Sequence, residues 1–406
     1  MEWINGGVTA PAGFKAGGIH CGIRPNKTKY DLALIVSEKE CSAAGLFTRN
    51  VVKAAPVYVS MNSLAVPKAK AIVANSGIAN ACAPHDMENA LEMQRLTAEA
   101  LHIDQQDVLI GSTGVIGVDL NVKSIEKGLP VLIEKLTSDA SGSDAAAKAI
   151  MTTDTVKKEK AVCFALGDAM VKIGGISKGS GMIHPNMGTM LCYITSDVCI
   201  DASVLKEALK EVCDQTFNRI SVDGDTSTND SLLILANGMA GNEMITEKNA
   251  DYEAFRDALL QLCTALAREM AKDGEGAKHL ITCRVHDCES EEKAEILAKS
   301  VIGSSLTKAA IFGCDANWGR VLCALGYSGE SFDPLKTDIS FSSAKGDVEV
   351  CKNGKGLAFD EEKAAEILKE DEVIIDISLH EGNEEVTCWG CDLTYDYVKI
   401  NGDYRT

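Results

Sequence analysis

The sequence has few aromatic residues, few prolines and no long apolar run. Aromatic side chains make up 5% of its 406 residues, and there are 8 prolines against 35 glycines. No stretch approaches the ~20 apolar residues that a transmembrane helix requires. We therefore expect no membrane-spanning segment, a core of aliphatic side chains, and many tight turns.

Positive charge is also scarce. The 40 Lys and Arg residues face 59 Asp and Glu residues, so the formal net charge is −19. General electrostatics will not hold such a chain to a nucleic-acid backbone or to an anionic membrane surface. The first residues also lack the basic and apolar regions of a signal peptide. We expect a cytoplasmic protein that binds neither nucleic acid nor membranes.

The 15 cysteines are an odd number and are spread along the whole chain. Without an export signal, this indicates free thiols in a reducing compartment rather than a disulfide framework. One Cys-x-x-Cys pair occurs, Cys388 and Cys391, with no second pair at zinc spacing near it. Buried thiols explain this pair better than a metal or redox site does. We expect no metal ion.

Short apolar runs alternate with amphipathic runs along the chain. Runs of the first kind predict strands and runs of the second kind predict helices. Their alternation indicates an α/β fold. The predicted strands are 32–36, 71–74, 108–110, 161–165, 190–194, 231–235, 347–351 and 372–379, and the predicted helices are 87–101, 124–136, 203–216, 252–273 and 291–303.

A polar, glycine-rich segment, GSTGVIG at 111–117, follows the apolar run 108–110. Such a turn can direct successive backbone N–H groups at one point, where they would hold an anion or a developing oxyanion. An ordinary turn is the plainer interpretation. The segment lacks the residue order of a phosphate loop and of a dinucleotide fingerprint.

A second such segment spans 178–197 and places Thr189 directly before a predicted core strand. A backbone break between Gly188 and Thr189 would leave Thr189 with a free α-amino group. That amine, with an ordinary pKa of about 7.7–8.0, could accept the proton of the threonine hydroxyl. Nucleophile and base would then belong to one residue. A threonine that only caps the strand is the alternative.

Segment 219–230 contains Asp223, Asp225 and Asp230 among Gly, Ser and Thr. Its spacing does not match an EF-hand calcium loop. We interpret it as a network of side-chain-stabilised turns that supports an active site. In segment 314–320, Trp318 and Arg320 indicate either a stacking site or, more simply, a structural turn.

Glu275 lies between Gly274 and Gly276 at the end of the longest helical pattern. The flanking glycines would let its carboxylate approach a ligand amine, although the end of a helix also explains them. The last residues, INGDYRT, predict a frayed tail.

Together these segments resemble the ornithine acetyltransferase family, also called glutamate N-acetyltransferases or ArgJ proteins. The resemblance covers nearly the whole chain. It rests on GGVTAPAGFKAGGI (6–19), ANSGIANAC (74–82), GSTGVIG (111–117), MTTDT (151–155), KGSGMIHPNMGTM (178–190), VDGDTSTND (222–230), DGEGAKH (273–279), NWGR (317–320) and YVKINGDYRT (397–406). His184, Gly188 and Gly402 are small departures from the family pattern.

The resemblance implies a layered αββα sandwich, similar in logic to the N-terminal-nucleophile hydrolases. It also implies a precursor that cuts itself between Gly188 and Thr189. The products would be an α chain, 1–188, carrying the oxyanion-hole and substrate loops, and a β chain, 189–406, that begins with the nucleophile. The two chains would stay associated as an α2β2 heterotetramer.

The functional residues of the family transfer position by position. The resemblance implies that Thr189 is the nucleophile and that Thr113 and Gly114 form the oxyanion hole. The implied substrate-binding residues are Thr152, Lys178, Thr189, Glu275, Asn401 and Thr406.

The implied activity is arginine biosynthesis by ping-pong acetyl transfer from N2-acetyl-L-ornithine to L-glutamate. An acetyl-Thr189 ester is the intermediate, and no cofactor is required. Acetyl-CoA would be a co-substrate for a second activity, amino-acid N-acetyltransferase. The alternatives are an exchange-only enzyme, an aminopeptidase or amidase of similar fold that passes the acyl group to water, and a non-catalytic binding module.

Overall fold

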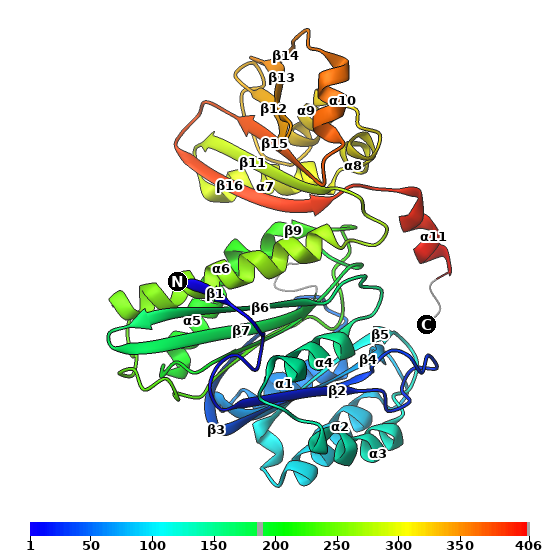
Figure 1. Cartoon of the computed structure of the whole chain (residues 1–406). Coiled ribbons are helices and arrows are strands. Elements are labelled where there is room, and N and C mark those ends of the chain that lie inside the picture. The colour runs from blue at the N-terminus through cyan, green and yellow to red at the C-terminus, as the bar shows by residue number, and fades with distance from the viewer. Residues whose placement is uncertain (185–189, 404–406) are drawn as a thin grey trace.

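The computed structural model describes residues 1–184 and 190–403, which form two α/β units (Figure 1). The predicted cleavage position, Gly188 and Thr189, and the terminal Thr406 lie outside the described residues. All fifteen cysteines are free thiols, as the sequence predicts. None of the helices described is both long and apolar enough to cross a bilayer.

The first unit is built on a nine-stranded sheet in the order β1-β6-β7-β8-β10-β3-β4-β5, with β2 also paired to β3. β8 and β10 follow residues 185–189 in the chain, yet they pair with β7 and β3, which precede them. The predicted α and β chains therefore contribute strands to one sheet. The strands are β1 (Glu2–Ile4), β2 (Phe14–Ile19), β3 (Leu32–Phe47), β4 (Lys68–Ile78), β5 (Val108–Val115), β6 (Lys158–Leu166), β7 (Ala169–Lys178), β8 (Leu191–Ser196) and β10 (Ser231–Ala236).

The long strand β3 folds this sheet into two facing layers. Its first part pairs with β2 and β4, its last part pairs with β10, and the register with β4 shifts between Val36 and Cys41. Such an irregularity bends a strand and increases its twist. One apolar cluster accordingly contains residues of β2 and β4 together with residues of β8 and β10. The layers touch so closely that a Cβ at Gly111 would collide with the Tyr193 hydroxyl.

Helices cover both outer faces of the folded sheet. Helices α5 and α6 share a core with β6, β7, β8 and β10, whereas α1, α2 and α3 contact the layer that contains β4 and β5. The alanine-rich helix α4 packs against β2. The αββα arrangement implied by the resemblance is therefore confirmed. The helices are α1 (Ala55–Ser63), α2 (Asp86–Leu101), α3 (Val122–Glu134), α4 (Ala140–Ile150), α5 (Ala202–Gln215) and α6 (Ala250–Lys272), with short 3₁₀ turns at Gln105–Asp107 and Phe217–Arg219.

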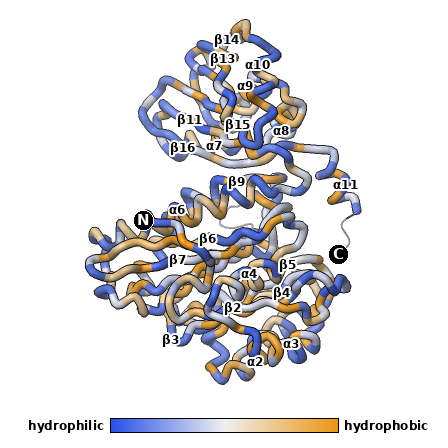
Figure 2. The backbone as a smooth tube through the Cα atoms, in the orientation of Figure 1, coloured by the Kyte–Doolittle hydropathy of each residue, from blue (hydrophilic) through white to orange (hydrophobic). Residues whose placement is uncertain are grey.

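The second unit has a seven-stranded sheet in the order β14-β13-β12-β15-β11-β16-β9. One face packs against α7, α9 and α10, and hydrophobic residues follow the strands and helices of both units (Figure 2). Its elements are β9 (Ile220–Ser221), β11 (Leu280–Cys288), β12 (Asp338–Ser343), β13 (Gly346–Lys352), β14 (Lys355–Gly356), β15 (Glu372–Ser378), β16 (Glu384–Cys391), α7 (Glu291–Gly303), α8 (Ser305–Phe312), α9 (Trp318–Gly326) and α10 (Glu361–Leu368).

Two elements join the units. Helix α6 contacts β16 and β11, and Leu280, Trp389 and Cys391 of those strands belong to the core cluster of the first unit. Helix α11 (Tyr395–Asp403) then leads the chain from the second unit back beside the first (Figure 1). The expectation of a frayed tail is wrong up to Asp403, because Thr394 and Tyr397 hydrogen-bond to Gly276 and Asp223 and hold this helix.

The buried face of α6 stabilises both units, so we expect its substitution to be costly. Leu262 is fully buried on this helix, whereas Leu306 of α8 is 61% exposed. Leu262→Ala should lower the free energy of unfolding by about 2–5 kcal/mol, because it leaves a cavity in a close-packed core. Leu306→Ala, the matched control, should cost less than about 0.5 kcal/mol. Urea unfolding of the full chain measures both, and equal midpoints would contradict the assignment.

Candidate functional site

A cavity of about 140 Å³ lies where several strands of the first unit end. It gathers residues that are as far apart in the sequence as β5 and α11. Six predicted site residues line it, namely Thr113, Gly114, Thr152, Lys178, Glu275 and Asn401. The structure therefore brings together every predicted site residue that it describes.

The end of β5 places Thr113 and Gly114 at the cavity. β5 pairs in parallel with β4, with Gly114 opposite Gly77. Gly114 has φ +131°, and a Cβ there would overlap the Gly77 backbone. Only glycine fits this position, because it alone combines that backbone angle with so close an approach. The strand can thus present backbone and side-chain donors side by side at its end.

The loop 151–155 is held by the carboxylate of Asp154. One of its oxygens, Oδ2, accepts the Thr152 N–H at 2.9 Å. The other, Oδ1, accepts the Gly179 N–H at 2.8 Å and the Lys158 ammonium at 2.7 Å. One buried carboxylate therefore fixes Thr152 and the residue after Lys178 relative to each other.

Lys158 connects this loop to the end of α6. Its Nζ also lies 2.6 Å from Oδ2 of Asp273, which follows the last residue of α6. The Asp273 carboxylate in turn accepts the backbone N–H and the hydroxyl of Thr155. The side chain of Lys158 is fully buried. Breaking a buried ion pair on one side leaves an uncompensated charge, so this network rigidly links the loops of the site.

Burial and neighbouring charges shift the pKa values of Asp154 and Lys178 in opposite directions. Burial alone would raise the pKa of Asp154, but the ammonium groups of Lys158 and Lys178 outweigh it and hold that pKa far below its usual range. For Lys178, burial is the larger effect and lowers the pKa, against the opposing pull of Asp154, Asp230 and Glu275. Lys178 is thus a buried cation whose charge is costly without an anionic partner.

Glu275 enters the cavity from the turn after α6. Its N–H donates to the Ser180 carbonyl at 2.8 Å, and its carboxylate lies where a Cβ of Gly181 would be. Asn401 of α11 donates from Nδ2 to Oε2 of Glu275 at 2.7 Å. Of the glycines beside Glu275, Gly274 follows the residue that ends α6, whereas Gly276 (φ +71°) packs against the start of α11, where a Cβ would collide with Asp396 and Tyr397.

Segment 219–230 forms the turn network that the sequence predicts. The Asp223 carboxylate accepts the N–H groups of Met182 and Ile183 at 2.6 and 2.9 Å. The Asn229 amide donates to the carbonyls of Ala79 and Ser112 at 2.6 and 2.8 Å, which ties this segment to the ends of β4 and β5. Burial raises the pKa of Asp230 well above its ordinary value.

The described residues on either side of 185–189 contact segment 219–230 and the strand β10 that follows it. Ile183 forms a β-bridge with Thr226, and the Met190 carbonyl accepts the Ser231 N–H at 2.9 Å. His184 contacts the Ser221 hydroxyl, and its pKa is lowered chiefly by burial.

Segment 314–320 lies away from the cavity and is structural. The Asn317 side chain caps α9 by accepting the Arg320 N–H, and Trp318 packs against the core of the second unit. Cys388 and Cys391 are both buried. Across residues 1–184 and 190–403, His, Cys, Asp and Glu side chains form no group suited to a metal ion.

Sequence reasoning missed several members of the site. Thr153 bonds the Ser180 hydroxyl at 2.7 Å, and Lys158 carries the ion network. The only local signal for the Asp154–Lys158 pair is a lysine four residues after an aspartate in a polar loop. That spacing does not predict that the two side chains are buried. The missed lining residues are Ala79, Ile116, Thr153, Gly181, Met182, Ser227, Thr228 and Asn229.

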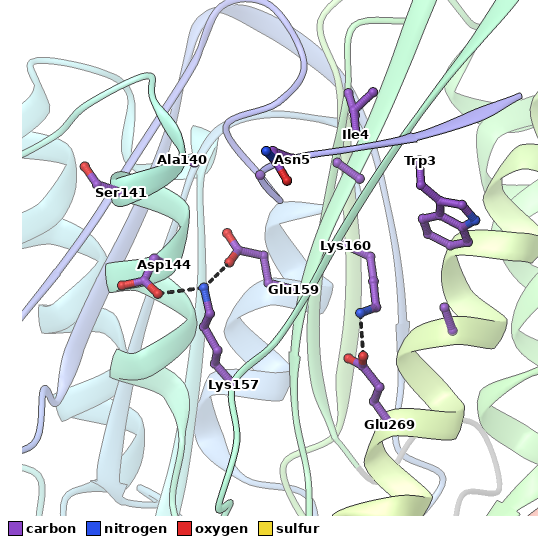
Figure 3. Close-up of a pocket in the computed structure, with 13 residues that line it drawn as sticks. Trp3, Ile4, Asn5, Ala140, Ser141, Asp144, Lys157, Glu159, Lys160 and Glu269 are labelled. Carbon is purple, nitrogen blue, oxygen red and sulfur yellow. Dashed lines mark hydrogen bonds and ion pairs between the residues drawn. The ribbon is translucent and has the colours of Figure 1, made fainter.

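A larger cavity of about 870 Å³ lies elsewhere, between β1, α4, β6 and α6 (Figure 3). Its lysines already have acidic partners: Lys157 bridges Asp144 and Glu159, and Lys160 pairs with Glu269. It contains none of the predicted site residues. Size alone therefore does not identify the site, whereas convergence of buried polar groups does.

The ion network predicts a sharp difference between two adjacent lysines. Lys158→Met should lower the free energy of unfolding by about 3–5 kcal/mol, because it leaves two buried carboxylates without their cation. Lys157→Met removes only the ion pairs of a side chain that is 39% exposed to solvent, so it should lower the free energy of unfolding by less than about 1 kcal/mol. Denaturant unfolding of both variants measures this, and equal losses would contradict a special role for Lys158.

Comparison with known proteins gives one consistent relationship. The model of the ArgJ family matches residues 15–406. The chain is 52% identical over 408 residues to the arginine biosynthesis bifunctional protein ArgJ of Symbiobacterium thermophilum, with full coverage of both chains. It is also 52% identical to ArgJ 1 of Clostridium acetobutylicum, over 99% of this chain and 98% of that protein.

A solved structure supports the same relationship. The crystal structure of the bifunctional protein argJ from Bacillus halodurans is 45% identical to this chain and aligns with a TM-score of 0.50. The match covers 98% of that chain but 52% of the present one. On these matches and on the site that its own motifs assemble, the chain belongs to the ArgJ family.

Proposed function

We propose that this protein is an arginine-biosynthesis acyltransferase that moves the acetyl group of N2-acetyl-L-ornithine to L-glutamate. The observation that carries the proposal is the cavity in which Thr113, Gly114, Lys178, Glu275 and Asn401 converge. The relatives that share about 50% identity with this protein over its whole length are named for arginine biosynthesis.

The reaction centres on Thr189, which lies outside the described residues. Self-cleavage after Gly188 frees the α-amine of Thr189, which then takes the hydroxyl proton as the oxygen attacks the acetyl carbonyl. The C–N bond of acetylornithine breaks, ornithine leaves as the amine, and the acetyl ester remains on Thr189. The α-amine of glutamate attacks that ester, which restores the hydroxyl. Splitting one amide exchange into two acyl transfers makes each step easier.

Thr113 and Gly114 stabilise the negative charge that develops on the acetyl oxygen. The Thr113 hydroxyl and the Gly114 N–H are donors at the end of a rigid strand, and Thr113 is only 8% exposed. Preorganised donors in a site shielded from water act more strongly than the same groups in water. Loss of one such donor typically costs about 3 kcal/mol of transition-state stabilisation.

The charged residues divide the recognition of the two amino acids. Lys178, a buried cation, pairs with the substrate α-carboxylate. Glu275 receives the ornithine side-chain ammonium, with Asn401 holding its second oxygen in place. Thr152 and the terminal Thr406, the latter outside the described residues, complete the binding set. No cofactor is required, because the threonine itself carries the acyl group.

The second activity is acetylation of glutamate with acetyl-CoA, which loads the same threonine from a thioester. The word "bifunctional" in the names of the relatives supports it. An exchange-only enzyme is the alternative, and acetylglutamate formation from acetyl-CoA and glutamate distinguishes the two. A hydrolase would instead pass the acetyl group to water, so the acceptor of the group, glutamate or water, distinguishes the two classes.

We further infer that the protein is cytoplasmic and works as an α2β2 assembly of its two chains. The free thiols favour a reducing compartment. Strands from both sides of residues 185–189 share one sheet, so a cut there would leave the two chains bound by backbone hydrogen bonds. The solved Bacillus halodurans chain spans about half of this chain, as a cleavage product would.

Removal of the nucleophile tests cleavage and catalysis together. Thr189→Ala should yield one uncut species of 43.2 kDa and no acetyl transfer, because it lacks the oxygen that performs both steps. The native protein should yield two chains, the second beginning at Thr189. Mass spectrometry and N-terminal sequencing measure this. An uncut native protein that still transfers acetyl groups would refute the mechanism.

The lowered pKa of Lys178 predicts an unusual alkaline limit. Substrate binding needs the charged ammonium, so kcat/KM should fall as pH rises through that pKa, at a lower pH than an ordinary lysine, near 10.4, would give. Arginine stays protonated throughout this range, so Lys178→Arg should be less active but lack this alkaline limb. The same limb in both proteins would show that another group causes it.

A further inference from the structure

A second cavity, of about 450 Å³, adjoins the catalytic one. The two share Thr152 and Thr153 in their walls. The ends of β4 and β5 also contribute to both cavities. Ala79, Thr113 and Gly114 line the catalytic cavity. The neighbouring residues Gly77, Ile78, Val115 and Val118 line the second one. A ligand long enough to occupy both cavities would pass over Thr152 and Thr153. We call this second cavity the outer cavity.

The outer cavity combines apolar walls with cations. Ile23, Ile78, Val115 and Val118 provide the apolar surface, whereas Arg24 and Lys29 provide positive charge. Arg24 and Lys29 therefore place positive charge beside the catalytic cavity of a protein whose net charge is −19, which suits a ligand with an anionic end and an apolar arm.

The wall that carries these cations is built rigidly. Asp31 is fully buried, and its carboxylate accepts four backbone N–H groups of residues 21–24 at 2.6–3.2 Å. The Arg24 guanidinium donates to the Met151 carbonyl, and its side chain lies where a Cβ of Gly77 would be. This ties the loop to segment 151–155 of the catalytic cavity.

Lys29 is held less tightly and remains exposed. Its Nζ lies 3.4 Å from the Thr152 carbonyl, which places the ammonium at the boundary between the two cavities. A long side chain on a fixed loop can reach an anionic group without moving the backbone. Lys29 is thus placed to contact the phosphates of a ligand whose reactive end lies in the catalytic cavity.

We propose that the outer cavity binds the coenzyme A portion of an acyl thioester donor. The pantetheine arm lies along the apolar wall, and Lys29 and Arg24 face its phosphates. This rests on the proposed second activity. Ornithine and glutamate are small and strongly polar, so neither requires an apolar cavity of this size, whereas coenzyme A is long, carries phosphates and has an apolar arm.

The chemistry follows from that placement. The Thr189 oxygen attacks the thioester carbonyl and the C–S bond breaks. The proton from the hydroxyl passes through the α-amine to the departing thiolate, which leaves as coenzyme A. The acetyl ester is the same intermediate as in the exchange reaction, and glutamate removes it in the same way. The outer cavity therefore affects only the thioester half-reaction.

The test compares two lysines of one loop in both reactions. Lys29→Glu places a carboxylate where phosphates bind, so it should raise the KM for acetyl-CoA at least about 10-fold, as expected for loss of a charge-assisted contact. Its kinetics for acetylornithine and for glutamate should change less than about 2-fold. Lys27→Glu is the control, because it makes the same charge change in the same loop but does not line the cavity.

Each outcome distinguishes this proposal from the proposed function. If Lys27→Glu and Lys29→Glu raise the KM for acetyl-CoA equally, or neither does, the outer cavity is not the coenzyme site, although the enzyme stays bifunctional. A rise in the KM for glutamate in Lys29→Glu would assign the cavity to that amino acid and overturn the proposal. A native protein that exchanges acetyl groups but does not use acetyl-CoA would refute it too, with the exchange function intact. Absence of exchange would refute the proposed function itself.

Discussion

The site depends on one buried ammonium group, that of Lys158, placed between the carboxylates of Asp154 and Asp273. Buried charges are tolerated only when they are paired and hydrogen-bonded. Here the pairing joins a loop before β6 to the end of α6, so neither can move without exposing a charge. Because Asp154 also orients Thr152 and Gly179, the network fixes the cavity wall on both sides of Lys178. The stability of the core and the geometry of the site therefore have the same origin.

The folded sheet explains how the chain could be cut between residues 184 and 190 and still keep its two parts together. β8 and β10 lie between strands that precede residues 185–189, and β3 pairs with β10 over six residues. A break would therefore release no unit as a separate domain. The second unit contributes through the turn after α6 and through α11, which brings Asn401 to Glu275. The cavity thus combines residues that lie far apart in the chain, from Ala79 to Asn401.

The two adjoining cavities suit a protein that takes one acyl group from different donors. The cavity lined by Thr113 and Lys178 is small and polar, whereas the outer cavity is larger, apolar and bordered by Arg24 and Lys29. Shared walls at Thr152 and Thr153 connect the two cavities. The ion network that fixes Thr152 therefore bears on both of them.

The sequence by itself determined the type of each element that it predicted and the family to which the chain belongs. The apolar runs at 108–110 and 231–235 became β5 and β10, because β-branched and aliphatic runs bounded by polar turns have few alternatives. The family motifs also predicted Thr113, Lys178 and Glu275 as site residues, and the structure places all three at one cavity. Only the tertiary structure decided that Lys158 is buried, that α11 continues to Asp403 and that the loop 23–29 borders a cavity. Each of these depends on partners more than a hundred residues away, and local pattern carries no information about such contacts.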